Sequence, residues 1–151
     1  MFFSFVSVLV KIFAFGLVVV LVSAFISVLV FVFVFLFEFL VHGFLMTGMY
    51  QATMSVWRPQ AESNMPVRLL SQFLFAMAVA FFYPIIGPDK ECKKAIPFGF
   101  GLGLVMAMPQ IASYSYLPIP ISISLTWAAA SFLKAFGSAF IIAKVFNKFA
   151  A

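Results

Sequence analysis

Residues 31–44 read FVFVFLFEFLVHGF, an aromatic and β-branched run that ends in a glutamate and a histidine. In water, such an alternation of Phe and Val is typical of a β-strand. In lipid, an isolated strand would leave its backbone N–H and C=O groups unpaired. A membrane barrel needs many strands with alternating polar residues, which this chain lacks. The stretch therefore predicts a helix that crosses a bilayer.

The composition indicates that lipid is the solvent for much of the chain. Of the 151 residues, 66% are hydrophobic and 9% are charged, and the net charge is +5. Soluble domains carry about 25% charged residues, and a soluble fold of this size could not bury so much apolar surface in one core. The basic residues are spread thinly between apolar blocks. This pattern indicates that they set the orientation of the chain in the membrane and do not form a nucleic-acid-binding surface. We predict an all-α integral membrane bundle with one domain, residues 1–151.

Four apolar blocks are long enough to span a bilayer as helices, since about 20 residues suffice. The first block, 2–46, is too long for one crossing, because 45 helical residues measure about 67 Å against a hydrocarbon core of about 30 Å. Residues 17–41 contain no Gly, Pro, Asn or Asp that would make a turn. We therefore predict one crossing here, and the predicted helices are 18–42, 69–86, 95–117 and 121–146.

The N-terminal residues 1–17 are predicted to be an apolar extension that lies along the inner interface or packs on a partner. They are not expected to be a cleaved signal peptide, because the apolar run continues to Phe37, well beyond a core of 7–15 residues. An alternative with five helices, broken at Gly16, stays open.

Lysine and arginine near the helix ends predict the orientation, because they gather on the cytoplasmic side. With four crossings, one side carries six basic residues and the other carries two. The six are Lys11, Lys90, Lys93, Lys94, Lys144 and Lys148, and the two are Arg58 and Arg68 in the loop 47–67. We predict a multi-pass membrane protein with both termini in the cytoplasm, and with Cys92 in a cytoplasmic turn.

Three ionisable residues form a candidate intramembrane polar site. Glu38 and His42 are four residues apart on one helix face, and Lys134 lies near the middle of the fourth helix. A charged lysine at mid-bilayer costs about 2.5–3.5 kcal/mol, so such groups normally face a partner, a cavity or the bundle interior. Glu38 is the expected partner of Lys134. The alternatives are that Glu38 and His42 mark the watery end of their helix, that Lys134 extends its stem toward an interface, and that Lys134 contacts an acidic group or lipid headgroup supplied by another subunit.

Two further sets of residues are predicted to make contacts. Gly99, Gly103 and Ala107 form a row of small residues that lets another helix approach closely, either within the chain or from another subunit. In the outer loop, Met49–Trp57 is predicted to form one short helix on the membrane surface, because Tyr50, Met54 and Trp57 share a face. The candidate residues of an outer-loop interface are Tyr50, Trp57 and Arg58.

From His42 onward the chain resembles a family of small, uncharacterised bacterial inner-membrane proteins with four helices. The resemblance covers about 110 residues. It is carried by the His42-Gly43 step, Tyr50, the Trp57-Arg58-Pro59 sequence, the glycine-rich third helix, the connection 118–120 and Trp127. It implies the four-helix fold and a location in the bacterial inner (plasma) membrane, and it implies no activity. Lys134 and the segment before Leu17 depart from the family pattern.

The sequence predicts a protein that is not an enzyme. No nucleophile–base set, phosphate-binding loop or dinucleotide motif is visible, and four acidic residues leave little for acid–base chemistry. One cysteine and one histidine exclude a multi-cysteine metal site and a bis-histidine haem within one chain, so no cofactor or metal is expected. The leading hypothesis is an accessory or structural subunit that contacts lipid and other membrane subunits. The alternative is a small oligomeric transporter or channel for a proton, ion or small solute.

Overall fold

The computed structural model describes residues 2–86 and 92–150, and every regular element in these ranges is helical. The elements are α1 (Phe2–Glu38), a π-helical segment (Phe39–Leu45), α2 (Thr47–Gln51), α3 (Met65–Phe82), α4 (Ala95–Ala112) and α5 (Ile121–Ala150), with short 3₁₀ turns between them. Among the described residues, four helices are long and apolar enough to span a membrane. These spans are Val6–Leu45, Met65–Ile85, Ala95–Ser115 and Ile121–Phe149. The predicted all-α fold with four candidate spans is confirmed.

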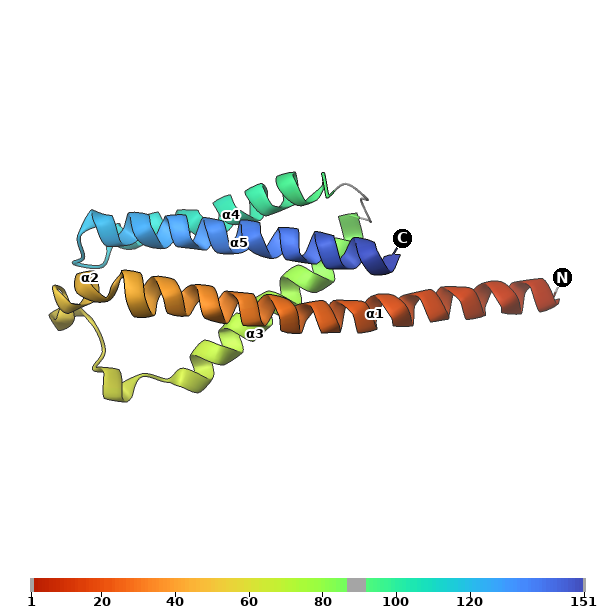
Figure 1. The fold of residues 1–151 in the computed structure, drawn as a ribbon, viewed down its shortest axis with the longest axis horizontal. Coiled ribbons are helices and arrows are strands. Elements are labelled where there is room, and N and C mark those ends of the chain that lie inside the picture. Colours follow the sequence, from red (N-terminus) through yellow and green to blue (C-terminus); the bar gives the residue numbers. More distant parts are fainter. Residues whose placement is uncertain (1, 87–91, 151) are drawn as a thin grey trace.

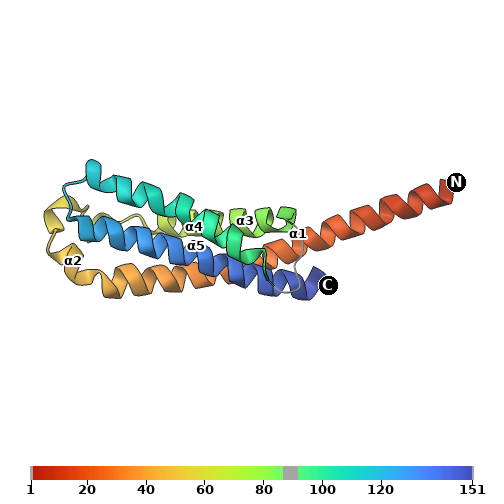
Figure 2. The ribbon, with the colours of Figure 1, turned by 90° about the horizontal axis from the view of Figure 1, so that it is seen from above.

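Helix α5 organises the bundle (Figure 1). Helix α4 packs along one side of α5 and makes the most extensive helix contact in the structure, and α1 runs antiparallel to α5 on another side. Helix α3 crosses α1 diagonally. The C-terminus and the N-terminal half of α1 point the same way, and α1 projects far beyond the end of α5 (Figures 1 and 2).

The first helix is longer than the predicted range 18–42. It begins at Phe2 and passes through Gly16 without a break, so the structure has no turn where the five-helix alternative requires one. At its other end the helix widens into the π-helical segment Phe39–Leu45, where the Met46 N–H donates to the Val41 carbonyl 2.8 Å away. Segments of π-helix are rare and often occur at functional sites. This one follows directly after Glu38 and contains His42.

The remaining helix ends lie near their predicted positions. Helix α3 begins at Met65, four residues earlier than predicted, because the Asn64 side chain accepts a hydrogen bond from the Val67 N–H at 3.2 Å and caps the helix. Helix α4 ends at Ala112 and continues as a 3₁₀ turn, Ser113–Ser115. Helix α5 continues beyond residue 146 to Ala150.

The predicted surface helix Met49–Trp57 is wrong. The structure has α2 at Thr47–Gln51 and a separate 3₁₀ turn at Met54–Val56, and Trp57 is extended. The Thr53 hydroxyl donates to the Met49 carbonyl at 2.8 Å, which gives the backbone an alternative to continuing the helix. Tyr50 and Trp57 still lie together, with ring centres 5.5 Å apart, whereas Met54 is 72% exposed.

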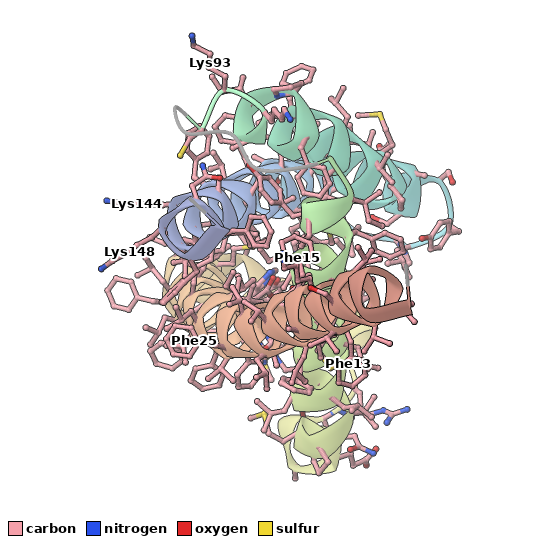
Figure 3. All side chains as sticks on the ribbon, turned by 90° about the vertical axis from the view of Figure 1, so that its right-hand side faces the viewer. Phe13, Phe15, Phe25, Lys93, Lys144 and Lys148 are labelled. Carbon is pink, nitrogen blue, oxygen red and sulfur yellow. The ribbon has the colours of Figure 1, made fainter. Side chains whose placement is uncertain are left out.

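Exposed basic side chains gather at the end of the molecule where α5 ends. Lys93, Lys144 and Lys148 lie on the same side of this end (Figure 3). Arg58 and Arg68 are exposed in and after the loop at the opposite end. Lys90, with the rest of 87–91, lies outside the described residues. Cys92, at the edge of this turn, is partly buried, and its sulfur accepts a hydrogen bond from the Asn147 side chain at 3.6 Å.

Candidate functional site

A buried ion pair joins α1 to α5. The Lys134 Nζ lies 2.5 Å from Glu38 Oε1, and each side chain is 14% exposed. The predicted pairing of Glu38 with Lys134 is therefore present in the structure. The ring of Phe75, on α3, lies with its centre 5.7 Å from the Lys134 nitrogen and provides a second favourable contact for the cation. Three helices thus meet at this lysine.

The second oxygen of Glu38 binds His42. The His42 Nε2 lies 3.1 Å from Glu38 Oε2, one turn along the same helix. The carboxylate therefore contacts Lys134 through one oxygen and His42 through the other. The structure brings together all three predicted residues of the intramembrane polar site. Because the carboxylate and the ammonium neutralise each other, the site can lie at membrane depth without a net charge when His42 is neutral.

A tyrosine from α2 extends this network. The Tyr50 hydroxyl lies 2.5 Å from His42 Nδ1, and the Trp127 indole N–H of α5 donates to the same hydroxyl at 2.7 Å. The Met46 sulfur lies 3.5 Å from it. The rings of His42 and Tyr50 are stacked, with an angle of 13° between their planes. Burial raises the pKa of the Tyr50 phenol above its usual value, so the hydroxyl keeps its proton at neutral pH.

Two tryptophans close the end of the site that faces the loop 47–67. The rings of Trp57 and Trp127 pack edge to face with their centres 5.7 Å apart, and the Trp57 indole N–H donates to the Thr53 hydroxyl at 2.9 Å. Tyr50 and Trp57 therefore connect the loop to the bundle. Arg58 is exposed and is no part of this network among the described contacts.

Sequence reasoning missed three members of the site: Met46, Phe75 and Trp127. For Trp127 a signal existed, because it precedes Lys134 by seven residues and so lies on the same face of α5. Gln72, which is buried one turn before Phe75 on α3, has no hydrogen-bond partner for its carbonyl oxygen within the described residues.

The row of small residues on α4 faces α5. Gly99, Gly103 and Ala107 are all buried at this contact. A methyl group built on Gly99 would lie 2.9 Å from the Ala139 Cβ, and one on Gly103 would lie 2.7 Å from the Phe132 ring. Of the two predicted alternatives, the structure therefore shows packing within the chain.

Comparison of the chain with family models finds no match, and neither the curated proteins nor the solved structures give one. The resemblance to a family of four-helix inner-membrane proteins stays a prediction.

Proposed function

We propose that this protein is a non-enzymatic accessory subunit of a larger membrane assembly and that it binds its partner through the N-terminal part of α1. Residues 2–22 are here called the α1 extension. The single observation that carries the proposal is their exposure: every side chain from Val6 to Val18 is exposed, although almost all of them are apolar. A helix that is apolar on all sides is stable only when apolar material surrounds it.

Length indicates that lipid alone does not cover the α1 extension. The rings of Phe25 and Phe149 pack edge to face, 6.5 Å apart, so α1 and α5 separate at the last turn of α5. Helix α5 has 30 residues and is therefore about 45 Å long, which matches a bilayer with its headgroups. The 21 residues of the α1 extension reach about 32 Å further. With the bundle placed across the bilayer, most of this extension lies beyond it and needs an apolar protein surface.

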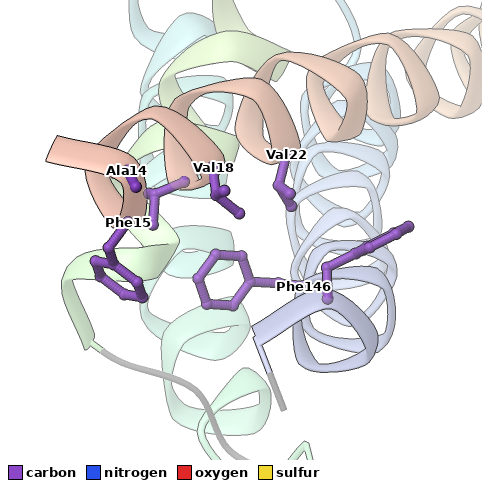
Figure 4. Close-up of a pocket in the computed structure, with 7 residues that line it drawn as sticks. Ala14, Phe15, Val18, Val22 and Phe146 are labelled. Atoms are coloured by element: carbon purple, nitrogen blue, oxygen red, sulfur yellow. The ribbon is translucent and has the colours of Figure 1, made fainter. Parts of the chain in front are cut away.

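A crevice at the base of the α1 extension is suited to receive side chains of such a partner. It has a volume of about 370 Å³ and lies between α1 and the end of α5 (Figure 4). All of its lining residues are apolar: Ala14, Phe15, Val18, Val19, Val22, Phe146 and Phe149. The crevice is continuous with the exposed face of the α1 extension, so one apolar helix from a partner is able to contact both.

The proposal is tested by placing a charge on the α1 extension. Phe13 is 76% exposed, so Phe13→Glu should leave the fold of the chain intact and abolish copurification with the partner after mild detergent extraction. Met54→Glu is the matched control, because Met54 is 72% exposed at the opposite end of the molecule. Native mass spectrometry measures how much of the partner is recovered with each of the two variants. Equal recovery of the partner with the two variants would contradict the proposal.

The orientation proposed with this function places the α1 extension and both termini in the bacterial cytoplasm. It is supported by the exposed lysines at that end of the bundle. With Cys92 replaced by Ala, Ser63→Cys should react with an impermeant maleimide added outside intact cells, whereas Lys93→Cys should react only after the membrane is permeabilised. The reverse labelling pattern would mean that the protein has the opposite orientation in the membrane.

A small oligomeric transporter is the second candidate function. The observation in its favour is the connected set of Glu38, His42 and Lys134 at membrane depth. Four helices rarely enclose a path, so this function requires a dimer or a larger oligomer. Purified protein in liposomes should then carry a proton or ion flux that Lys134→Met abolishes, and a wild-type protein without flux would exclude it.

A further inference from the structure

The contacts of His42 determine which of its nitrogens carries hydrogen. Glu38 is an acceptor, because it already binds the Lys134 ammonium. The His42 Nε2, 3.1 Å from the other carboxylate oxygen, must therefore carry a hydrogen and donate it. The His42 Nδ1, which faces the Tyr50 hydroxyl at 2.5 Å, is the acceptor in the neutral ring.

The Tyr50 hydroxyl can bond to Nδ1 in either direction. An indole N–H only donates, so Trp127 occupies one lone pair of the Tyr50 oxygen and leaves the other free. The single hydroxyl hydrogen has two acceptors within reach, His42 Nδ1 and, at 3.5 Å, the Met46 sulfur. With neutral His42, the hydroxyl donates to the nitrogen, which is the stronger acceptor.

Adding one proton to Nδ1 leaves every group in this network with a partner. The Nδ1–H then donates to the free lone pair of the Tyr50 oxygen, and the Tyr50 hydroxyl rotates to donate to the Met46 sulfur. Nε2 continues to donate to Glu38. No heavy atom needs to move and no covalent bond other than the new N–H forms. We propose that His42 is a reversible proton-binding site, with the proton held between His42 Nδ1 and the Tyr50 oxygen.

The surroundings allow the proton to enter and to be neutralised. The charged and titratable groups near His42 are Glu38 on its own helix, Tyr50 on α2, Lys134 on α5 and, acting on Tyr50 from the start of α3, Arg68. Protonation adds one positive charge, which the carboxylate of Glu38 faces directly. His42 lies four residues before Met46, near the loop end of its span, and its side chain is 23% exposed, so it is not sealed inside the bundle. The inference is independent of the proposed accessory role.

The test uses the full chain in lipid nanodiscs with ¹⁵N-labelled histidine. His42 is the only histidine, so the two ring nitrogens give unambiguous signals. We expect the neutral ring to carry its hydrogen on Nε2, and to convert reversibly to the doubly protonated form when the buffer is taken from about pH 8 to about pH 5. A ring that keeps one protonation state throughout, or a neutral ring with hydrogen on Nδ1, would overturn the proposal.

Two substitutions test whether the network holds the proton. Met46→Leu removes the acceptor that the Tyr50 hydroxyl uses in the protonated state, so the proton affinity of His42 should fall by about three- to ten-fold. Met54→Leu, at an exposed position, should leave it unchanged. A Met46→Leu protein that binds the proton as tightly as the wild type contradicts the assignment. If Met46→Leu does not fold, Tyr50→Phe replaces it, and an unchanged Nδ1 signal in that variant contradicts the assignment equally.

Discussion

Replacing Lys134 with methionine should lower the free energy of unfolding by about 3 kcal/mol, because it leaves the Glu38 carboxylate buried with His42 as its one remaining partner among the described residues. Glu38→Gln should have a similar effect, since it leaves the ammonium of Lys134 without a counter-charge at membrane depth. The double variant should be clearly less destabilised than the sum of the two, because neither charge is then left alone.

Reversible unfolding in mixed micelles measures this cycle. Lys144→Met is the matched control, because Lys144 is exposed on the same helix and its loss should change the free energy of unfolding by less than about 0.5 kcal/mol. Strictly additive effects of Lys134→Met and Glu38→Gln would show that the two side chains do not stabilise each other, despite their contact.

The contact between α4 and α5 should respond in opposite directions to one added methyl group at two neighbouring glycines. Gly99→Ala should destabilise the protein by about 1–3 kcal/mol, because the new Cβ would lie 2.9 Å from the Ala139 Cβ and 3.2 Å from the backbone of Phe136. Neither atom can move unless the helices separate. Gly101→Ala meets no atom within 4 Å, so it should stabilise α4 by about 0.5–1 kcal/mol through helix propensity.

Thermal unfolding of the two variants in the same detergent distinguishes these effects. The midpoint should fall for Gly99→Ala and rise slightly for Gly101→Ala. Equal shifts of the two midpoints would mean that glycine at position 99 lets α4 and α5 approach no more closely than alanine would.

The parts of the fold that depend on local chemistry could be predicted from the sequence. The apolar block lengths predicted the spans, and the spacing of Gly99, Gly103 and Ala107 predicted a close helix contact. The Glu38–Lys134 pair followed from counting residues from the ends of two antiparallel helices, because a charge inside lipid has few possible partners. The absence of helix breakers in 17–41 explains why α1 continues as one helix.

The contacts between distant residues could not be predicted in the same way. Trp127 and Tyr50 are 77 residues apart, and their hydrogen bond depends on how α5 lies against a loop that has no regular pattern. The helix widens into the π-helical segment that contains His42, and no residue type marks this change in the sequence. The prediction of a single surface helix over Met49–Trp57 failed because Thr53 bonds to the preceding turn.

The central claim is that the α1 extension lies against another protein in the native membrane. Site-specific photo-crosslinking tests it most directly, with benzoylphenylalanine placed at Phe13 or, as the control, at Phe44, which is 72% exposed in the π-helical segment that follows α1. The account predicts one discrete heavier adduct, of a mass unlike any multiple of 16.7 kDa, from position 13 and none from position 44. Lipid adducts alone at position 13, equal to those at position 44, would contradict it.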